Sequence, residues 1–284
     1  MNKIVWFRYD LRIYENAAFS ESIKNGNVLP IFIFDEGLFK LETSSSFHLK
    51  FIKDSLNDLK KKLRKKYNSN LSIYYGNTIE IFKYLIQKYS VSEIYSNRIF
   101  KHKYLKELDV KCENLFNDLK VKWILKDQFG IDLNHRNRFK WSYNWNKFIQ
   151  SDEQAYSFDC KFINIKNNFD FENVKTNKIN GNLVQLGGRD EAIKLLDSFI
   201  ETRSENYQRE MSSPISGEVA CSRLSPHITY GTISLKEIHR KISEKLKKVC
   251  TINKRKSLIA FKSRLAWHCH FIQKLYDEPE IEHK

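Results

Sequence analysis

Residues 28–34 read VLPIFIF, an unbroken apolar run that constrains the fold more than any other segment of the chain. A strand with one face in water alternates apolar and polar residues, whereas a strand covered on both faces stays apolar along its length. Both faces are covered when helices pack on each side of a parallel sheet. The run therefore predicts a central strand of such a sheet.

Strand and helix signals alternate around this run. The other strand candidates are Ile4–Phe7, Leu71–Tyr75, Glu93–Tyr95 and Val121–Leu125, and the helical candidates are 15–25, 46–66, 78–89 and 101–119. In the second helical candidate, Ser46 occupies the position expected of an N-cap. Such alternation requires right-handed crossovers between parallel strands. We therefore expect residues 1–130 to form an α/β domain with a doubly wound parallel sheet.

The pattern changes after residue 130. Residues 131–187 are rich in Asn, Lys, Asp and aromatic residues without clear periodicity, which predicts an inter-domain linker lying over both domains. Near its end, Gly187 and Gly188 form an isolated pair that would serve as a loop hinge.

Residues 188–284 have helical periodicity and predict an all-α domain. The helical candidates are 190–200, 234–248 and 257–275, and Ser234 with Glu237 starts the second of them as a capping box. The third candidate has an aromatic-rich face with few partners in the rest of the chain. We therefore expect this domain to be truncated, or to complete its core with another chain.

The net charge of +15, from 49 Lys and Arg against 34 Asp and Glu, favours a polyanionic partner such as nucleic acid. The excess is mostly Lys and accompanies many Asn and Ile residues, a usage also expected of an AT-rich genome. Charge alone therefore leaves the partner open.

Cysteine spacing and hydropathy indicate the compartment. The five cysteines lie at positions 112, 160, 221, 250 and 269 without a C-x-x-C pair, which predicts reduced thiols and neither a disulfide framework nor a zinc site. No apolar run approaches the roughly 20 residues that span a bilayer, and the N-terminus has no signal-peptide pattern. We expect a cytoplasmic protein with no membrane partner.

Several catalytic and binding motifs are missing from the sequence. It contains no G-x-G-x-x-G, Walker loop, G-x-S-x-G elbow or H-E-x-x-H helix. The pair His268 and His270 is two residues apart on a predicted helix, so the side chains diverge and cannot share a metal ion without distortion. No metal site is expected, and no catalytic residue can be assigned.

One segment carries groups that suit a phosphate. Tyr207 is followed by Cys221, Ser222, Arg223, Leu224 and Ser225, which lead into Pro226. An arginine can form a bidentate contact with phosphate, and serine hydroxyls and free backbone N–H groups can supply the rest. The alternative is that the serines are helix caps and Arg223 forms a surface salt bridge.

A second segment combines positive charge with aromatic rings. Arg264, Trp267, His268 and Phe271 are three or four residues apart on the last predicted helix. An indole beside a positive charge suits stacking on a nucleobase. Packing of Trp267 in the core is the alternative.

Two motifs in the chain resemble those of the photolyase/cryptochrome family of blue-light flavoproteins. VWFRYDLR at residues 5–12, followed by ENAA at 15–18, is similar to the opening signature of the family. CSRLSPHITYGTIS at residues 221–234 is similar to its second signature. The resemblance implies an N-terminal α/β antenna domain (1–130), a long linker (131–187) and a helical FAD-binding domain (188–284).

The resemblance also implies a cofactor, a partner and an activity. FAD would contact Tyr207, Cys221, Ser222, Arg223, Leu224 and Ser225. Trp267, with Arg264 and His268, would contact a pyrimidine dimer flipped out of DNA, whose ring splits after light-excited reduced FAD donates an electron. That would make the protein a monomeric carbon–carbon lyase that repairs DNA. An antenna chromophore such as folate or deazaflavin is also implied, although no residue in 1–130 identifies it.

Two departures from the family pattern change these expectations. The dimer photolyases have a glutamate where this chain has Arg264, which cannot accept a hydrogen bond. The string SRLAWHCHF at residues 263–271 instead resembles a less-studied bacterial branch, so a cryptochrome-type photoreceptor without repair activity stays an alternative. Family members are also longer, and we therefore expect this chain to be a fragment that carries part of the FAD site.

Overall fold

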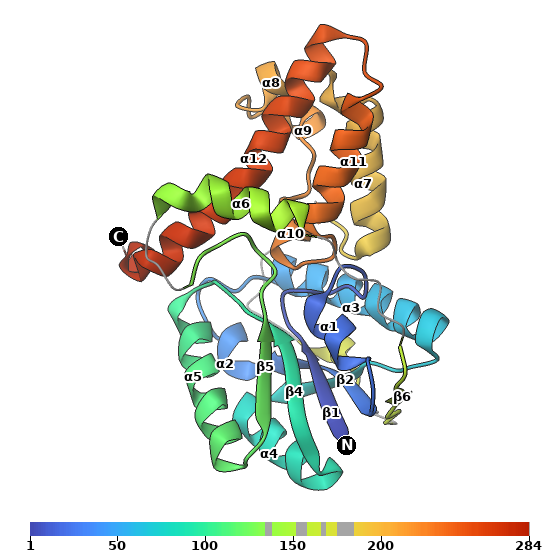
Figure 1. Cartoon of the computed structure of the whole chain (residues 1–284), viewed down its shortest axis with the longest axis vertical. Helices are drawn as coiled ribbons and strands as arrows, with labels where there is room; N and C mark the ends of the chain where they lie inside the picture. The colour runs from blue at the N-terminus through green and yellow to red at the C-terminus, as the bar shows by residue number, and fades with distance from the viewer. Residues whose placement is uncertain (134–137, 152–157, 166–168, 175–184, 284) are drawn as a thin grey trace. The chain divides into compact units, whose positions relative to one another are not determined.

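The computed structural model describes residues 1–133, 138–151, 158–165, 169–174 and 185–283. The chain forms two compact units (Figure 1). Unit 1 comprises Met1–Gln128 and Glu153–Arg189, and unit 2 comprises Phe129–Asp152 and Asp190–Lys284. Residues 131–187, predicted as a linker, thus include segments assigned to both units.

Unit 1 is built on the predicted parallel sheet. The strands are β1 (Asn2–Phe7), β2 (Asn27–Asp35), β3 (Ser72–Gly76), β4 (Val91–Asn97) and β5 (Lys122–Lys126), in the order β3-β2-β1-β4-β5. All pairs are parallel, and a short sixth strand, β6 (Lys161–Phe162), pairs with the start of β2. The prediction of a doubly wound α/β domain is confirmed.

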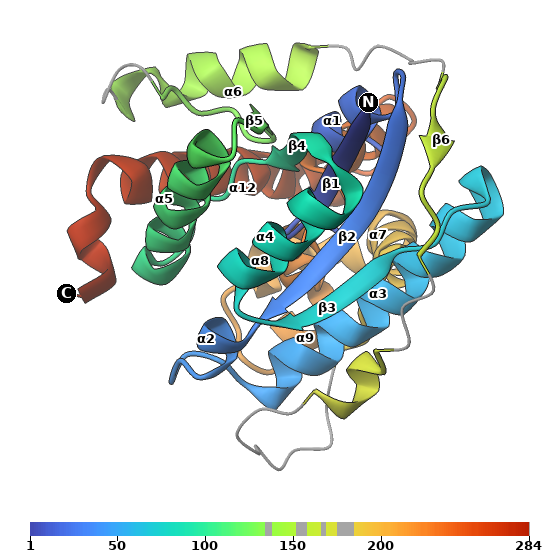
Figure 2. The same cartoon turned by 90° about the horizontal axis from the view of Figure 1, so that it is seen from below.

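Helices cover both faces of this sheet (Figure 2). They are α1 (Ala17–Ser22), α2 (Glu36–Phe39), α3 (Ser46–Tyr67), α4 (Thr78–Tyr89) and α5 (Lys103–Asp118). Successive β1 side chains alternate between the faces, because Trp6 packs edge-on against Phe82 of α4 whereas Phe7 packs against Phe19 of α1. The apolar run of β2 is buried because each face has its own helical layer.

The N-cap of α3 is one residue earlier than the sequence predicted. Ser45 has an extended backbone, and its hydroxyl accepts a hydrogen bond from the His48 N–H at 3.4 Å. Ser46, the predicted cap, is the first helical residue. The correction follows from geometry, since a cap residue must lie outside the helical region for its side chain to reach back.

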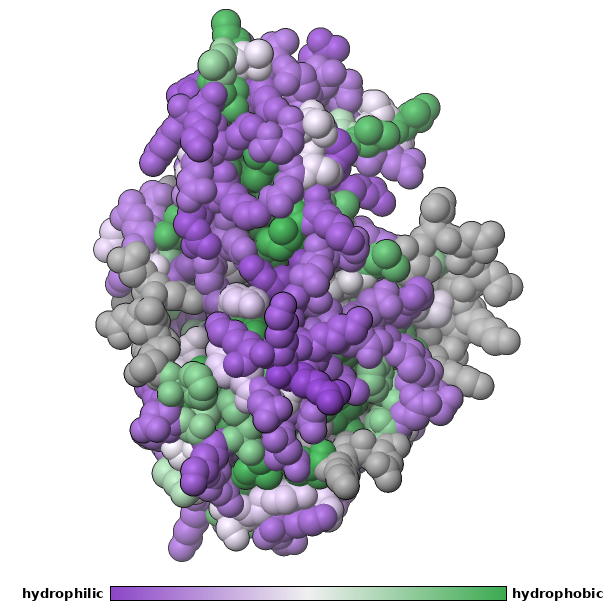
Figure 3. All heavy atoms as spheres, turned by 90° about the vertical axis from the view of Figure 1, so that its right-hand side faces the viewer, coloured by the Kyte–Doolittle hydropathy of each residue, from purple (hydrophilic) through white to green (hydrophobic). Residues whose placement is uncertain are grey.

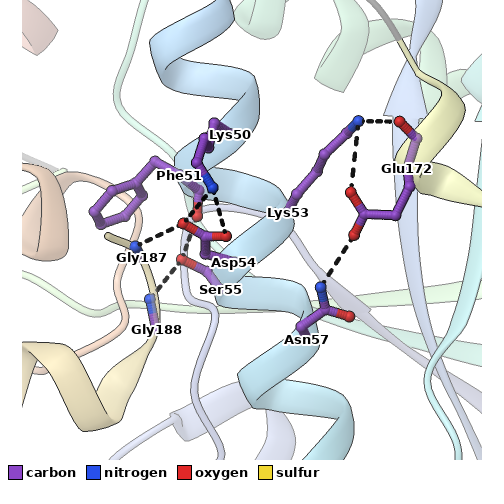
Figure 4. Close-up of polar contacts among 9 residues, drawn as sticks. All are labelled: Lys50, Phe51, Lys53, Asp54, Ser55, Asn57, Glu172, Gly187 and Gly188. Carbon is purple, nitrogen blue, oxygen red and sulfur yellow. Dashed lines mark hydrogen bonds and ion pairs between the residues drawn. The ribbon is translucent and has the colours of Figure 1, made fainter. Parts of the chain in front are cut away.

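The pair Gly187 and Gly188 is fixed against α3 rather than acting as a free hinge (Figure 4). The N–H of Gly187 donates to the Asp54 carboxylate at 3.3 Å, and that of Gly188 donates to the Ser55 hydroxyl at 3.0 Å. A Cβ on Gly187 would lie 2.1 Å from the Phe51 carbonyl oxygen. These two residues are therefore glycines because the backbone lies directly on the helix.

A second stretch of unit 1 contacts α3 nearby. Glu172, in the turn η2 (Phe171–Asn173), accepts a hydrogen bond from the Asn57 side chain at 3.1 Å, and its main-chain carbonyl accepts one from Lys53 (Figure 4). Both contacts are made with α3, the helix that also binds the glycine pair. Helix α3 therefore holds two separate parts of residues 153–189.

The described part of unit 2 has helices and turns. They are η1 (Arg138–Lys140), α6 (Trp141–Gln150), α7 (Arg189–Glu201), η3 (Arg203–Asn206), α8 (Tyr207–Glu210), α9 (Gly217–Ala220), α10 (Ser225–Thr229), α11 (Leu235–Leu246), α12 (Ile252–Asp277) and η4 (Pro279–His283). The predicted N-cap of α11 is confirmed, because the Ser234 hydroxyl accepts the Glu237 N–H at 3.0 Å. Helix α6 was not predicted, and its Trp145 is buried in the core.

Helix α12 is the central helix of unit 2, with α6, α8, α11 and η3 packed against it. Its buried face includes Leu258, Phe261, Leu265 and Cys269. The Cys269 sulfur accepts the Gly130 N–H at 3.3 Å, and Gln273 exchanges hydrogen bonds with the backbone of Asp132.

Polar residues dominate the face of the molecule drawn in Figure 3, where apolar residues form small separate patches. Within the described ranges, no helix has both the length and the apolar character needed to cross a membrane.

Candidate functional site

The segment before α10 is held in place by an arginine that the sequence did not single out. The guanidinium of Arg203 donates to the carbonyls of Leu195 at 2.7 Å and Ser222 at 3.3 Å, and to that of Cys221. Its Nε donates to the Ser198 hydroxyl at 2.8 Å. Arg203 therefore ties the 221–222 backbone to α7 with several hydrogen bonds from one rigid group.

This attachment sets which side chains face outward. Ser222 is buried and its hydroxyl accepts the Leu224 N–H at 3.3 Å, while Leu224 is completely buried. Arg223 and Ser225, between and after them, are exposed. Arg223 has φ +61°, a left-handed conformation that is uncommon for a residue with a side chain. The predicted phosphate segment thus presents alternate residues to solvent, and its serines are not helix caps, since Leu224 is the N-cap of α10.

Two positive charges lie close together at this loop. Burial lowers the pKa of Arg203, and the charge of Arg223 lowers it further. Burial raises the pKa of the Cys221 thiol, an effect that both arginines oppose. Among the described residues, Arg203 donates to carbonyl and hydroxyl oxygens, and no carboxylate forms an ion pair with it. An anion bound here would offset the repulsion between the guanidinium groups.

Tyr207 links this loop to α12. Its ring is buried and lies edge-on to Phe199 at 5.4 Å and to Phe261 at 5.5 Å between centroids. Burial raises the pKa of Tyr207, Cys221 raises it further, and Arg264 lowers it. The tyrosine is therefore within electrostatic range of both predicted segments, and the structure brings them into one region of unit 2.

Arg264 and Trp267 form a stacked pair on the exposed side of α12. The Arg264 guanidinium carbon lies 4.1 Å from the centre of the Trp267 ring, the geometry of a cation–π contact. Trp267 is 39% exposed, so it does not fill the core. A cation stacked on an accessible indole can bind a nucleobase or another flat anionic group.

His268 does not join this pair. Its ring packs against Phe129 at 5.2 Å, whereas His270 packs against Trp141 at 5.2 Å. The two histidines thus contact different aromatic rings, as the helical spacing predicted. Within the described ranges, no three His, Cys, Asp or Glu side chains come together to hold a metal ion.

The first of the two motifs, at residues 5–12 and 15–18, lies at the carboxyl edge of the sheet in unit 1. The Asp10 carboxylate accepts hydrogen bonds from the Arg8 N–H at 2.7 Å, the Asn97 amide at 2.6 Å and the Asn16 amide at 3.2 Å. Arg8 and Asp10 follow β1 and Asn97 ends β4, where the strand order reverses and where open α/β sheets bind ligands. Here the protein's own buried side chains occupy the position directly between the two strands.

A partly buried lysine lies beside this network. The Lys101 ammonium is 4.5 Å from the centre of the Tyr9 ring. Burial lowers the pKa of His48, and the charge of Lys101 lowers it further. Burial lowers the pKa of Lys101 to about 8. No hydrogen bond or ion pair joins Lys101 to another residue of the described ranges. The cluster has the charge and aromatic surface needed for a flat, anionic ligand.

Comparison with known proteins shows what the chain is similar to. The family model described as DNA photolyase matches residues 3–128. The deoxyribodipyrimidine photo-lyase of Halobacterium salinarum is 33% identical over 85 residues, which are 30% of this chain and 18% of that protein. Cryptochrome-2 of Gallus gallus is 23% identical over 309 residues, which are 98% of this chain and 52% of that protein. Residues 3–128 thus resemble the DNA photolyase family, and the relatives of the chain include photolyases and cryptochromes.

Solved structures of photolyases and cryptochromes share the fold. The archaeal photolyase from Sulfolobus tokodaii, whose crystal structure holds two FAD molecules, superposes with a TM-score of 0.70 at 22% identity. The match covers 99% of this chain and 61% of the archaeal chain. The chain therefore spans about half of the length of the Gallus gallus cryptochrome and about three fifths of that of the archaeal photolyase. Its assignment to a bacterial branch stays a prediction.

Proposed function

We propose that this chain carries part of the flavin site of a light-driven, DNA-repairing flavoprotein of the deoxyribodipyrimidine photolyase type. The observation that carries the proposal is the loop braced by Arg203, which presents Arg223 and Ser225 to solvent beside a second guanidinium. The same region contains Tyr207 and the Arg264–Trp267 pair.

The residues of this loop fit a phosphate-bearing cofactor. Arg223 and Ser225 would contact the phosphates of FAD. Arg203 would fix the loop and add positive charge. Tyr207 would form the edge of the site next to α12. Cys221, Ser222 and Leu224 would shape the backbone that carries these groups. When bound and reduced, FAD supplies an electron under blue light. The chain's own contribution is to bind and orient the cofactor, because no residue here is placed to act as an acid or a base.

The Arg264–Trp267 pair would be the DNA-facing part of the site. Its exposed indole suits stacking on an extruded base or lesion, and the net charge of +15 favours approach to the phosphate backbone. His268 would support this helix through its contact with Phe129. DNA is thus the proposed partner of a monomeric cytoplasmic protein.

A photoreceptor function of the cryptochrome type is the second candidate. Arg264 supports it, because a guanidinium cannot accept the hydrogen bond that a carboxylate would accept from a lesion. The relatives also include both photolyases and cryptochromes.

An antenna chromophore would bind in unit 1 near Lys101, Tyr9 and His48. The unpaired ammonium of Lys101 supports a ligand with a carboxylate or phosphate, a property shared by folates and flavins. This site is separate from the loop of unit 2, and either cofactor could bind without the other.

Light-dependent repair tests the function directly. The complete protein, loaded with reduced FAD, is mixed with an oligonucleotide that contains a thymine dimer and illuminated with blue light. Restoration of the intact thymines, absent in the dark, is expected for a photolyase. Flavin photoreduction without repair of dimer or other pyrimidine lesions would favour the photoreceptor.

A further inference from the structure

Three of the eight histidines of the chain pack against one stretch of unit 2, residues 129–133 and 138–151, which includes α6. Each contacts a different aromatic ring of that stretch, and the pairs are His268 with Phe129 at 5.2 Å, His270 with Trp141 at 5.2 Å and His239 with Trp145 at 6.0 Å. Histidine is the side chain whose charge changes most readily between pH 5 and 8. The stretch is therefore attached to the rest of unit 2 through groups that can respond to acid.

Helix α6 depends on these contacts for its stability. It has ten residues, a length at which an isolated helix is not stable in water, and it lies against α11 and α12 (Figure 1). Trp145 is its one buried side chain, and the ring that Trp145 meets edge-on is that of His239. Lys236, one turn before His239 on α11, donates to the Ser151 carbonyl at 2.8 Å and to its hydroxyl at 2.9 Å. One histidine and one lysine of α11 thus hold the second half of α6.

The surroundings of His239 oppose a positive charge on its ring. Burial and, to a smaller extent, the charge of Lys262 on α12 lower the pKa of His239 to about 4. Helix α6 contributes Lys147 and no acidic residue between Trp141 and Gln150. On α11 itself, Glu237 is two residues before His239 and lies on the other side of the helix.

The carboxylates that α7 directs toward α11 also lie away from His239. Asp197 pairs with Lys241 at 2.7 Å, and Glu201 pairs with Lys245. These two lysines follow His239 by two and six residues, which places them on the opposite side of α11. The acidic groups of the neighbouring helix are therefore paired elsewhere and do not offset a charge on His239.

We infer that residues 129–133 and 138–151 form a clasp that opens in mild acid, because protonation of His239 breaks its contact with Trp145. A proton on the half-buried ring places a positive charge near Lys262, whereas the opened clasp exposes the imidazole to water, which solvates the charge. Opening therefore becomes more favourable as the pH falls from 6.5 toward 4. The inference does not depend on flavin or DNA binding, and it gives acid an effect on the packing of α12, the helix that carries the Arg264–Trp267 pair.

Hydrogen exchange of the full chain, followed by mass spectrometry between pH 7 and pH 5, tests the clasp. Exchange rates are corrected for the intrinsic dependence on pH, so that they report the opening equilibrium of each segment. With a pKa of about 4 in the closed form and 6.5 in the open form, opening at residues 144–151 is expected to increase about twentyfold between pH 7 and pH 5. Exchange in α7 is expected to increase less.

Variants of two histidines separate the clasp from a general effect of acid. H239F keeps a ring against Trp145 but cannot take a proton, and its opening is expected to increase less than threefold over the same range. H239Q, which also stays uncharged, is the second variant, for use where the larger ring does not fit. H227N removes a fully buried histidine of α10 and is the matched control, in which the twentyfold increase at residues 144–151 should persist.

Two results would overturn the clasp. One is an increase in opening at residues 144–151 that is equally large in the wild type and in both His239 variants, since the titrating group would then be another residue. The other is an equal loss of protection in α6 and α7 that H227N prevents, since acid would then unfold unit 2 as a whole.

Discussion

The guanidinium of Arg203 is hydrogen-bonded to the main-chain carbonyl of Cys221, 18 residues further along the chain. This contact joins η3 to the loop that carries the second family signature. Because Arg203 donates to several carbonyls at once, a residue outside the signature fixes the loop backbone. The hydrogen bonds of Arg203 to this backbone therefore determine where Arg223 and Ser225 lie.

Arg203→Lys is expected to loosen this loop. Lysine keeps the charge but cannot donate to several carbonyls from one planar group, and unsatisfied carbonyls cost about 1–3 kcal/mol in the free energy of unfolding. Chemical denaturation and hydrogen exchange of residues 219–224 measure the effect. Arg209→Lys, at an exposed position of α8, is the control and should change neither. Equal exchange rates in both variants would contradict the bracing role.

Arg223→Gly separates backbone strain from charge. Glycine adopts φ +61° without a steric penalty, so the free energy of unfolding should stay equal or rise by up to about 1 kcal/mol. FAD affinity should fall about tenfold in the same variant, because a phosphate contact is lost. Calorimetry and FAD titration give the two quantities. A drop in stability with unchanged FAD affinity would make Arg223 a structural residue.

Trp267→Ala is expected to weaken binding of lesion-containing DNA more than binding of undamaged duplex. Only an extruded base can stack on the indole, and stacking contributes about 1–3 kcal/mol per base. Trp267→Phe should retain part of the difference. Competition binding with the two oligonucleotides measures it, and equal losses for both would show that Trp267 does not face a base.

Gly187→Ala is expected to destabilise the protein by more than about 2 kcal/mol. The new Cβ would lie 2.1 Å from the Phe51 carbonyl oxygen, so either the helix or the segment must move. Gly217→Ala serves as the control, because its nearest contact would be 3.2 Å away. Thermal unfolding measures both variants, and a similar Tm for the two would contradict the close packing on α3.

His227 should make stability fall in mild acid. Its side chain is fully buried, with Nδ1 2.8 Å from the Thr232 hydroxyl, and burial lowers its pKa to about 4. The unfolded chain, with a histidine pKa near 6.5, binds more protons between pH 6.5 and 4, so the stabilisation is complete above pH 6.5 and is lost as the pH falls toward 4. Between pH 7 and 5 the loss is about 1–2 kcal/mol. His227→Asn should flatten this part of the profile, measured by urea denaturation, and an unchanged slope would contradict the assignment.

The elements with strong periodicity were predictable from the sequence. The apolar run of β2 and the alternation around it defined the parallel sheet, since both patterns arise from burial of strand faces. Helix α6 was missed because its residues, WSYNWNKFIQ, mix aromatic and polar side chains without strong helical propensity. It forms because Trp145 and its neighbours pack in the core of unit 2.

The site was partly predictable. The second signature indicated the loop, and helical spacing correctly paired Arg264 with Trp267. Arg203 could not be predicted from the sequence. It belongs to no motif, and its role depends on carbonyls that are distant in the sequence. The attachment of Gly187 and Gly188 to α3 was equally hidden, since a glycine pair alone does not distinguish a hinge from a close backbone contact.

The central claim is that the loop braced by Arg203 binds a phosphate-bearing flavin. Backbone NMR spectra of the isotope-labelled chain, recorded during titration with FAD, test it most directly because weak binding is still detected. The account predicts shifts concentrated at residues 221–225, around Tyr207 and at Arg264, which the Arg223→Gly variant suppresses. Saturable FAD binding that shifts none of these residues, or no shift at all at millimolar FAD, would contradict it.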